Sequence, residues 1–311
     1  MSSPMLMEAR VSFRESLELA GRSPATLALY DRFLKELESW LSNNGKPLTV
    51  EEVESSHVRG FLLHLSRRRK RPGYRHRCRP QGGLAPETLR GYYRTLSCFF
   101  AWCKREGLLN GREPMRNVRK PSPEYKEMTV LTDEEVGRFL TFLDKPSAQK
   151  RTLYVAFSLM WRLGLRVGEV CQLRLSDLNV EAGSLLVRGK GKKQRRLPVS
   201  VRLRGILQSY VEDIRPKLDK GCSDALLLSC VGKRLRPGSL RKSYRRYAGR
   251  AGVPGTPHSL RHSFATRAAR SGVHILYLQK VLGHSSVTTT ERYFHCAFED
   301  LRRELEKLED R

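Results

Sequence analysis

The chain has 311 residues, enough for two ordinary domains with hydrophobic cores of their own. It carries 59 Lys and Arg against 32 Asp and Glu, a formal net charge of +27 that favours a polyanionic partner. Nucleic acid is the first candidate for that partner and an anionic membrane surface the second. We expect no membrane contact, because the chain has no run of about 18 apolar residues and its first residues do not resemble a signal peptide.

Cysteine usage argues against two further classes of protein. The seven cysteines are odd in number and form no C-x-x-C pair, which speaks against a disulfide framework and against a zinc site. We therefore expect no metal ion, and a reducing cytoplasm is the expected compartment.

Helices are predicted throughout the first part of the chain. Ser23 and Pro24 form a favourable N-cap and first-turn pair, and the apolar residues that follow recur at three- and four-residue intervals. Further helices are expected near residues 50–65 and 86–106, and Gly107 is a natural end for the last of them.

A strongly basic segment separates the second of these helices from the third. Residues 67–79 hold eight Lys or Arg and no acid, so this segment cannot pack as core. It is either a solvated loop or a loop that becomes ordered on phosphates, and we favour contact with DNA that does not depend on base sequence. The candidate contacts are Arg67, Arg68, Arg69, Lys70 and Arg71.

A change of composition marks a boundary between two domains. Three prolines and several basic residues between positions 114 and 126 are typical of a linker, and helical order resumes at the capping box Thr132–Glu135. We expect a helical DNA-binding domain over residues 1–115, a linker over 116–127 and a second domain over 128–311.

The second domain is predicted to combine helices with one hairpin. Two short segments, residues 183–188 and 195–199, flank a Gly-Lys-Gly-Lys turn, which indicates a hairpin of two antiparallel strands. The fold class is therefore mainly α, with a small antiparallel β-sheet in the C-terminal domain. Further helices are expected near residues 203–211, 239–251, 257–271 and 275–282.

Several side chains in this domain are able to hold a phosphate. Thr256 and Pro257 predict a helix start, so His258 and Arg261 should share one face near a helix N-terminus, where an anion is favoured. A surface His–Arg pair on an ordinary helix is the plainer interpretation.

The other candidates also have plain structural interpretations. Arg166 lies among apolar neighbours and needs an acidic partner or a ligand, and Lys190 could be a solvated lysine at the hairpin turn. His284 follows Gly283, the expected end of a helix, and Tyr293 could be an ordinary half-buried tyrosine.

The order of these residues along the chain carries more information than any one of them. The strings GLRVGE, Gly-Lys-Gly, HSLRHSFAT and LGHSSVTTTERY begin at residues 164, 189, 258 and 282. They resemble the motifs of the tyrosine recombinases, also called the phage integrase family, and in particular the bacterial members that resolve chromosome dimers. The likeness covers about residues 128–298, and the helical first part matches the family's core-binding domain only in general layout.

The resemblance implies a two-domain clamp around double-stranded DNA and cleavage without a metal ion or cofactor. Five residues would bind and polarise the scissile phosphate, and Tyr293 would be the nucleophile that forms a 3′-phosphotyrosyl link. The five are Arg166, Lys190, His258, Arg261 and His284.

The chemistry of these groups agrees with that assignment. A phenol with an ordinary pKa of about 10 is almost all neutral near pH 7 and attacks poorly without help. Guanidinium groups favour the phenolate and hold non-bridging oxygens as charge gathers on them. Lys190 is our candidate for the acid that protonates the leaving 5′ oxygen, and His258 is our candidate acceptor of the phenol proton.

Three functions remain open at this point. The chain is a site-specific DNA recombinase acting on a mobile element or on chromosome dimers, a related enzyme that only relaxes supercoils, or a DNA-binding protein that has kept the fold without catalysis. The HxLRH string and the modest length favour the first. We expect dimers and a tetramer on a double-stranded DNA site, linked through an amphipathic helix in residues 299–311, in the nucleoid of the cytoplasm.

Overall fold

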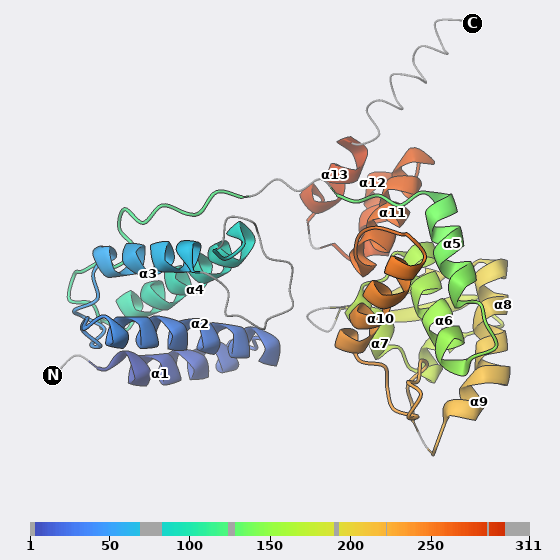
Figure 1. Ribbon diagram of the computed structural model, residues 1–311, viewed down its shortest axis with the longest axis horizontal. Coiled ribbons are helices and arrows are strands. Elements are labelled where there is room, and N and C mark those ends of the chain that lie inside the picture. Colours follow the sequence, from blue (N-terminus) through green and yellow to red (C-terminus); the bar gives the residue numbers. More distant parts are fainter. Residues whose placement is uncertain are drawn as a thin grey trace, which may run out of the picture. The chain divides into compact units, whose positions relative to one another are not determined.

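The computed structural model divides into two compact units, Met1–Lys126 and Glu127–Arg311, and each is described here by itself (Figure 1). The structure describes residues 4–68, 83–123, 128–189, 193–221, 223–284 and 286–295, with the side chains of residues 292 and 295 excepted.

Within the described residues of the first unit, four helices pack around one hydrophobic core (Figure 1). The core is built from the apolar faces of all four, with Leu37, Phe61 and Phe99 almost fully buried. Ser23 caps the second helix as predicted, because its side chain accepts a hydrogen bond from the backbone of Thr26. The helices are α1 (Leu6–Leu19), α2 (Pro24–Asn43), α3 (Ser55–Arg67) and α4 (Pro86–Arg105).

The first of these helices was not predicted from the sequence. The side chain of its N-cap residue, Met5, makes no capping hydrogen bond, so the usual start signal is absent. The helix also buries Arg10, whose guanidinium pairs with Asp31 and Glu38 on α2. Contacts between helices therefore decide the structure of this segment, and they are not visible in its local sequence pattern.

The second unit is also mainly helical, and it contains the predicted small sheet. Its helices pack around a core in which α6 is buried on nearly every face. Their bounds are α5 (Asp133–Leu143), α6 (Ala148–Leu163), α7 (Val167–Gln172), α8 (Val201–Ser209), α9 (Arg215–Leu218), α10 (Pro237–Arg250), α11 (Pro257–Arg270), α12 (Ile275–Leu282) and α13 (Thr288–His295). A 3-10 turn η1 (Leu175–Asp177) precedes the sheet, and a π-helical segment η3 (Tyr210–Ile214) continues α8.

The sheet confirms the predicted hairpin. Its strands β1 (Leu178–Asn179), β2 (Ser184–Arg188) and β3 (Gln194–Pro198) follow one another in order, and both pairs are antiparallel. Leu185 faces Leu197 in the β2–β3 register, and both are buried in the core. Val187 faces Arg195, so one inward position of β3 carries a charged residue.

Gly164 fixes the end of α6 against two later helices. Its φ of +63° lies in the left-handed region, and a Cβ built there would lie 2.5 Å from Phe264 of α11 and 3.0 Å from Leu282 of α12. This close approach sets the path of the chain into Arg166 and the first turn of α7.

We expect Gly164→Ala to destabilise the protein by about 2 kcal/mol, because the new methyl group needs both a left-handed backbone and displacement of Phe264. Gly137→Ala in α5 is the matched control, since a Cβ added there would meet no atom within 4 Å, and it should stabilise by about 0.5–1 kcal/mol. Urea denaturation of both variants and of the parent chain measures these changes in the free energy of unfolding. Equal midpoints for the two variants would contradict the packing argument.

Candidate active site

Arg166 lies at the start of α7 and is held by groups from two segments. Its backbone N–H donates to Oε2 of Glu169 over 2.8 Å, and its Nη1 donates to Oε1 of the same carboxylate over 2.9 Å. Its guanidinium also donates to the backbone oxygens of Leu282 (3.1 Å) and Gly283 (3.3 Å) at the end of α12. The sequence predicted an acidic partner or a ligand for Arg166, and Glu169 is that partner.

Arg261 is buried beside Arg166, with 3% of its surface exposed. Its Nη2 donates to the backbone oxygen of Leu282 over 2.7 Å, so both arginines bind the same carbonyl group, and its Nη1 donates to Gly164. Burial, and then the charge of Arg166, lower the pKa of Arg261 to about 10. Two cations held this close together form a site for an anion.

Glu169 balances part of this charge. Its carboxylate accepts two hydrogen bonds from Arg195, of 3.0 and 2.9 Å, and lies 3.9 Å from Nη1 of Arg261. Burial acts to raise the pKa of Glu169, but the hydrogen bonds and charges of Arg195 and then Arg166 outweigh it, and the net shift is downward. Three guanidinium groups around one carboxylate leave an excess of two positive charges in the cluster.

Arg195 was missed by the sequence analysis. It comes from β3, and its Nε donates to the backbone oxygen of Val281 over 2.8 Å while its other nitrogens bind Glu169. Arg195 therefore joins the hairpin, α7 and the end of α12. The feature that could have indicated its role is its place on the strand, because Arg195 is a charged residue that faces the buried Val187.

His284 follows α12, and its ring is oriented by hydrogen bonds at both nitrogens. Nη2 of Arg261 lies 2.9 Å from Nε2 of His284, and Nδ1 lies 2.9 Å from Oγ1 of Thr290. Because a guanidinium only donates, Nε2 accepts and Nδ1 carries the proton. In this arrangement His284 orients Arg261 and lies next to the cationic cluster.

Tyr293 lies on α13 and packs into the same region. Its side chain is buried, with 2% exposed, against apolar residues of α11 and α12. Its ring centroid lies 6.4 Å from that of His284, and its hydroxyl oxygen lies 2.8 Å from Nδ1 of His262. The structure thus brings Tyr293 and His284 together with Arg261, which lies 23 residues before His284 in the sequence.

His258 occupies the first turn of α11 and is the most exposed of the described candidates. Partial burial and the positive charges of Arg261, Arg241 and Arg166 lower the pKa of His258. A neutral imidazole with an N–H donor at the edge of a cationic cluster suits contact with a phosphate oxygen.

Lys190 lies outside the described residues. Its neighbour Gly189 borders the cluster, because a Cβ added there would lie 3.8 Å from Oε1 of Glu169.

Of the basic candidates in the first unit, two are described. Arg67 is the last residue of α3 and does not lie in a loop, and Arg68 pairs with Glu36 of α2 at 3.6 Å. The remaining basic candidates, Arg69, Lys70 and Arg71, and the tail 299–311 lie outside the described residues.

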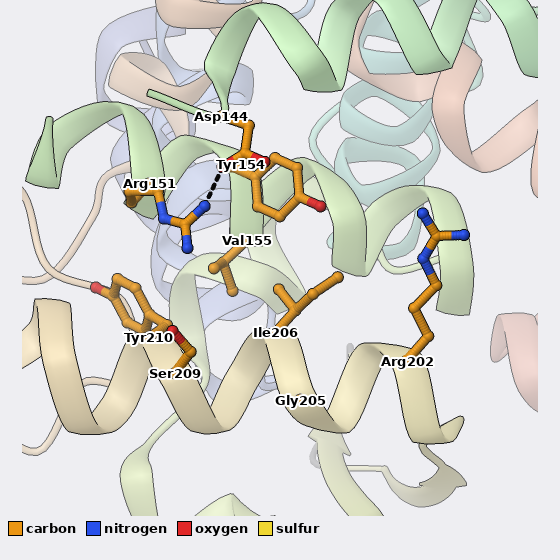
Figure 2. A pocket seen from close by; sticks show the side chains of 9 residues that line it. All are labelled: Asp144, Arg151, Tyr154, Val155, Arg202, Gly205, Ile206, Ser209 and Tyr210. Carbon is orange, nitrogen blue, oxygen red and sulfur yellow. Dashed lines mark hydrogen bonds and ion pairs between the residues drawn. The ribbon is translucent and has the colours of Figure 1, made fainter. Parts of the chain in front are cut away.

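A separate cavity of about 370 Å³ lies between α6 and α8 (Figure 2). Arg151 pairs with Asp144 on its wall, and Arg202 projects from α8. None of the five described candidates lines this cavity, so it is distinct from the cationic cluster.

The described residues show neither a metal-binding cluster nor a membrane-spanning helix. They contain no group of three or more His, Cys, Asp or Glu able to hold a metal ion. Among the helices in the same part of the chain, none is long and apolar enough to cross a membrane.

Comparisons with known proteins agree on one family. Residues 129–300 match the Phage integrase family. The tyrosine recombinase XerA of Thermococcus kodakarensis is 33% identical over 95% of this chain and 93% of its own length. The tyrosine recombinase XerD of Staphylococcus epidermidis is 29% identical over 91% of this chain and 92% of its own length.

Solved structures share the fold at lower identity. The integrase of the Tn1549 transposon in complex with a circular intermediate DNA has a TM-score of 0.72 and 22% identity, and the match covers 99% of this chain and 100% of that one. The XerH recombinase in a post-cleavage complex with difH DNA has a TM-score of 0.70 and 22% identity, over 91% of this chain and 80% of that one. Together with the site geometry and the matched family, these relationships show that the chain belongs to the phage integrase family and is a tyrosine site-specific recombinase.

Proposed function

We propose that this recombinase cleaves one strand of its DNA site with Tyr293 and holds the scissile phosphate with Arg166 and Arg261. The observation that carries the proposal is the shared Leu282 carbonyl, to which both guanidinium groups donate. That carbonyl and Glu169 fix the two cations side by side before any DNA binds. Paired, preorganised donors are the arrangement that stabilises charge on the non-bridging oxygens of a phosphodiester.

We infer the following cleavage step. The phenol oxygen of Tyr293 attacks phosphorus as its proton passes to a histidine of α11, the bond from phosphorus to the 5′ oxygen breaks, and a 3′-phosphotyrosyl link forms. Lys190 protonates the leaving 5′ oxygen, and neutral His258 donates a hydrogen bond to a non-bridging oxygen. His284 acts through Arg261, whose guanidinium it orients.

Strand rejoining is the reverse of this step with a different 5′ hydroxyl. The phosphotyrosyl link keeps the energy of the original phosphodiester, so the exchange needs neither a nucleotide nor a metal ion. The target is double-stranded DNA from a mobile element or a chromosome-dimer site.

We further propose the assembly in which the exchange takes place. Residues 1–115 bind DNA, with Arg67–Arg71 among the contacts, residues 116–127 link the units, and residues 128–311 carry the chemistry. Relatives by fold include a lambda integrase dimer bound to a COC′ core site and a lambda integrase tetramer bound to a Holliday junction. We infer dimers and a tetramer of this chain on DNA, linked through residues 299–311, in the nucleoid of the cytoplasm.

Tyr293→Phe should abolish the covalent adduct and leave DNA affinity within about threefold, because only the attacking oxygen is lost. The substrate is a labelled, nicked duplex that carries the site found by protection footprinting, and the reaction contains EDTA. Tyr247→Phe on α10 is the matched control and should form the adduct normally. A covalent adduct formed by Tyr293→Phe, or a requirement for a divalent ion, would refute the mechanism. If the parent chain relaxes supercoils but exchanges no strands between two sites, the recombinase activity is refuted.

Arg166→Lys and Arg261→Lys should each slow single-turnover cleavage by about 10³-fold or more, because a lysine cannot reproduce paired donation to a phosphate. DNA affinity should change far less, since many other cations contact the backbone. Arg202→Lys, at the separate cavity, is the control and should cleave at the parent rate. Cleavage within tenfold of the parent in both active-site variants would remove the arginines from the mechanism.

Deletion of residues 299–311 should spare binding to a single site and weaken the pairing of two sites by about tenfold or more. The physical reason is the amphipathic pattern of the tail, whose leucines need a hydrophobic partner. Sedimentation of the protein with one-site and two-site DNA measures both properties. Unchanged pairing by the truncated chain would show that the tail does not link the subunits.

A further inference from the structure

The phenol of Tyr293 has a protein partner that was not identified from the sequence. Its hydroxyl oxygen lies 2.8 Å from Nδ1 of His262, a distance typical of a hydrogen bond between a phenol and an imidazole. His262 follows Arg261 directly on α11, and α11 and α13 pack against each other. The contact therefore joins two packed helices of the same unit.

The other histidine of α11 is less suited to accept this proton. His258 and His262 are four residues apart, with ring centroids 6.3 Å from each other. Partial burial of His258, together with the charges of Arg261, Arg241 and Arg166, disfavours its protonated form. His258 is thus suited to donate to a phosphate oxygen and poorly suited to take up a proton.

Burial of the phenol restricts which groups can take its proton. Tyr293 is only 2% exposed, so bulk water has little access to its oxygen. A proton acceptor in the reaction must lie within hydrogen-bond reach of that oxygen, and the imidazole of His262 does.

We propose that His262, rather than His258, is the catalytic residue that accepts the phenol proton of Tyr293 during strand cleavage. This inference rests on the proposed function, in which Tyr293 is the nucleophile. Nδ1 of neutral His262 takes the proton as the phenol oxygen bonds to phosphorus and the bond to the 5′ oxygen breaks. In the rejoining step the imidazolium of His262 returns the proton to the departing phenol oxygen, so His262 ends each cycle neutral.

The charges of the cluster support this transfer. Moving the proton over one hydrogen bond creates an imidazolium next to a phenolate, so the pair as a whole stays neutral in a buried place. Arg261 lies in the same part of the site, because its guanidinium hydrogen bonds to His284, whose ring stacks on that of Tyr293. A cation at this position favours the phenolate that His262 helps to form.

The first test compares His262→Asn with the matched control His274→Asn. An Asn amide can keep a hydrogen bond near the position of Nδ1 but cannot accept a proton, whereas the amide introduced by His274→Asn can still cap α12. We expect His262→Asn to form the tyrosyl adduct about 100-fold more slowly in single turnover, with DNA affinity within about threefold of the parent. His274→Asn should cleave at the parent rate, and thermal melting checks that both variants are folded.

A second measurement separates proton transfer from positioning. Tyr293 is replaced by 3,5-difluorotyrosine, whose ring fluorines make the phenol more acidic and so less dependent on an acceptor. The rate deficit of His262→Asn should then shrink by about tenfold or more. A merely structural role would leave the same deficit with either phenol.

Each outcome bears on a definite claim. If the parent chain forms no adduct at all, the proposed function fails before His262 is tested. If the parent forms the adduct and His262→Asn matches it, or its deficit is unchanged by the acidic phenol, then His262 is not the proton acceptor. Should His262→Asn melt well below the parent, His262→Gln is measured in the same pair of reactions and decides by the same criterion.

Discussion

The candidate active site depends on two like charges, one of them buried, that are held around one backbone carbonyl. Arg166 and Arg261 both donate to the oxygen of Leu282, and the carboxylate of Glu169 lies beside both of them. Such a cluster is unfavourable without compensation, because each cation loses water and repels the other. The carbonyl groups at the end of α12 supply partial negative charge, and Glu169 supplies a full one. The cluster keeps an excess of positive charge, which a phosphate would offset.

The residues around this cluster have separate tasks that follow from their hydrogen bonds. Arg195 fixes Glu169 and the end of α12, and His284 orients Arg261 through a defined tautomer. Neither needs to contact DNA to matter for the reaction. On α11, His262 contacts the phenol, and the charges of nearby arginines disfavour protonation of His258.

The sequence predicted the elements that have strong local signals. It placed α12 at its observed bounds, because Gly283 ends it, and it located α11 from Pro257 at the first helical position. The hairpin followed from alternation and a glycine-rich turn. Helix α1 was missed because ion pairs of Arg10 with another helix stabilise it.

The sequence proposed the members of the candidate site, but it did not report their contacts. Motif order identified Arg166, Arg261, His284 and Tyr293, which the structure brings together. Arg195 binds Glu169, 26 residues away, and His262 contacts Tyr293, 31 residues away. Contacts between residues so far apart cannot be predicted from local sequence spacing. Lys190 stays a prediction.

Gly283 shows how far the constraints of this site extend beyond its chemistry. It has a φ of +63°, and a Cβ there would lie 2.9 Å from Nη1 of Arg195. A methyl group there would need a left-handed backbone and a displaced guanidinium at Arg195, the group that holds Glu169. The arrangement of charges thus depends on a residue that has no side chain to offer to DNA.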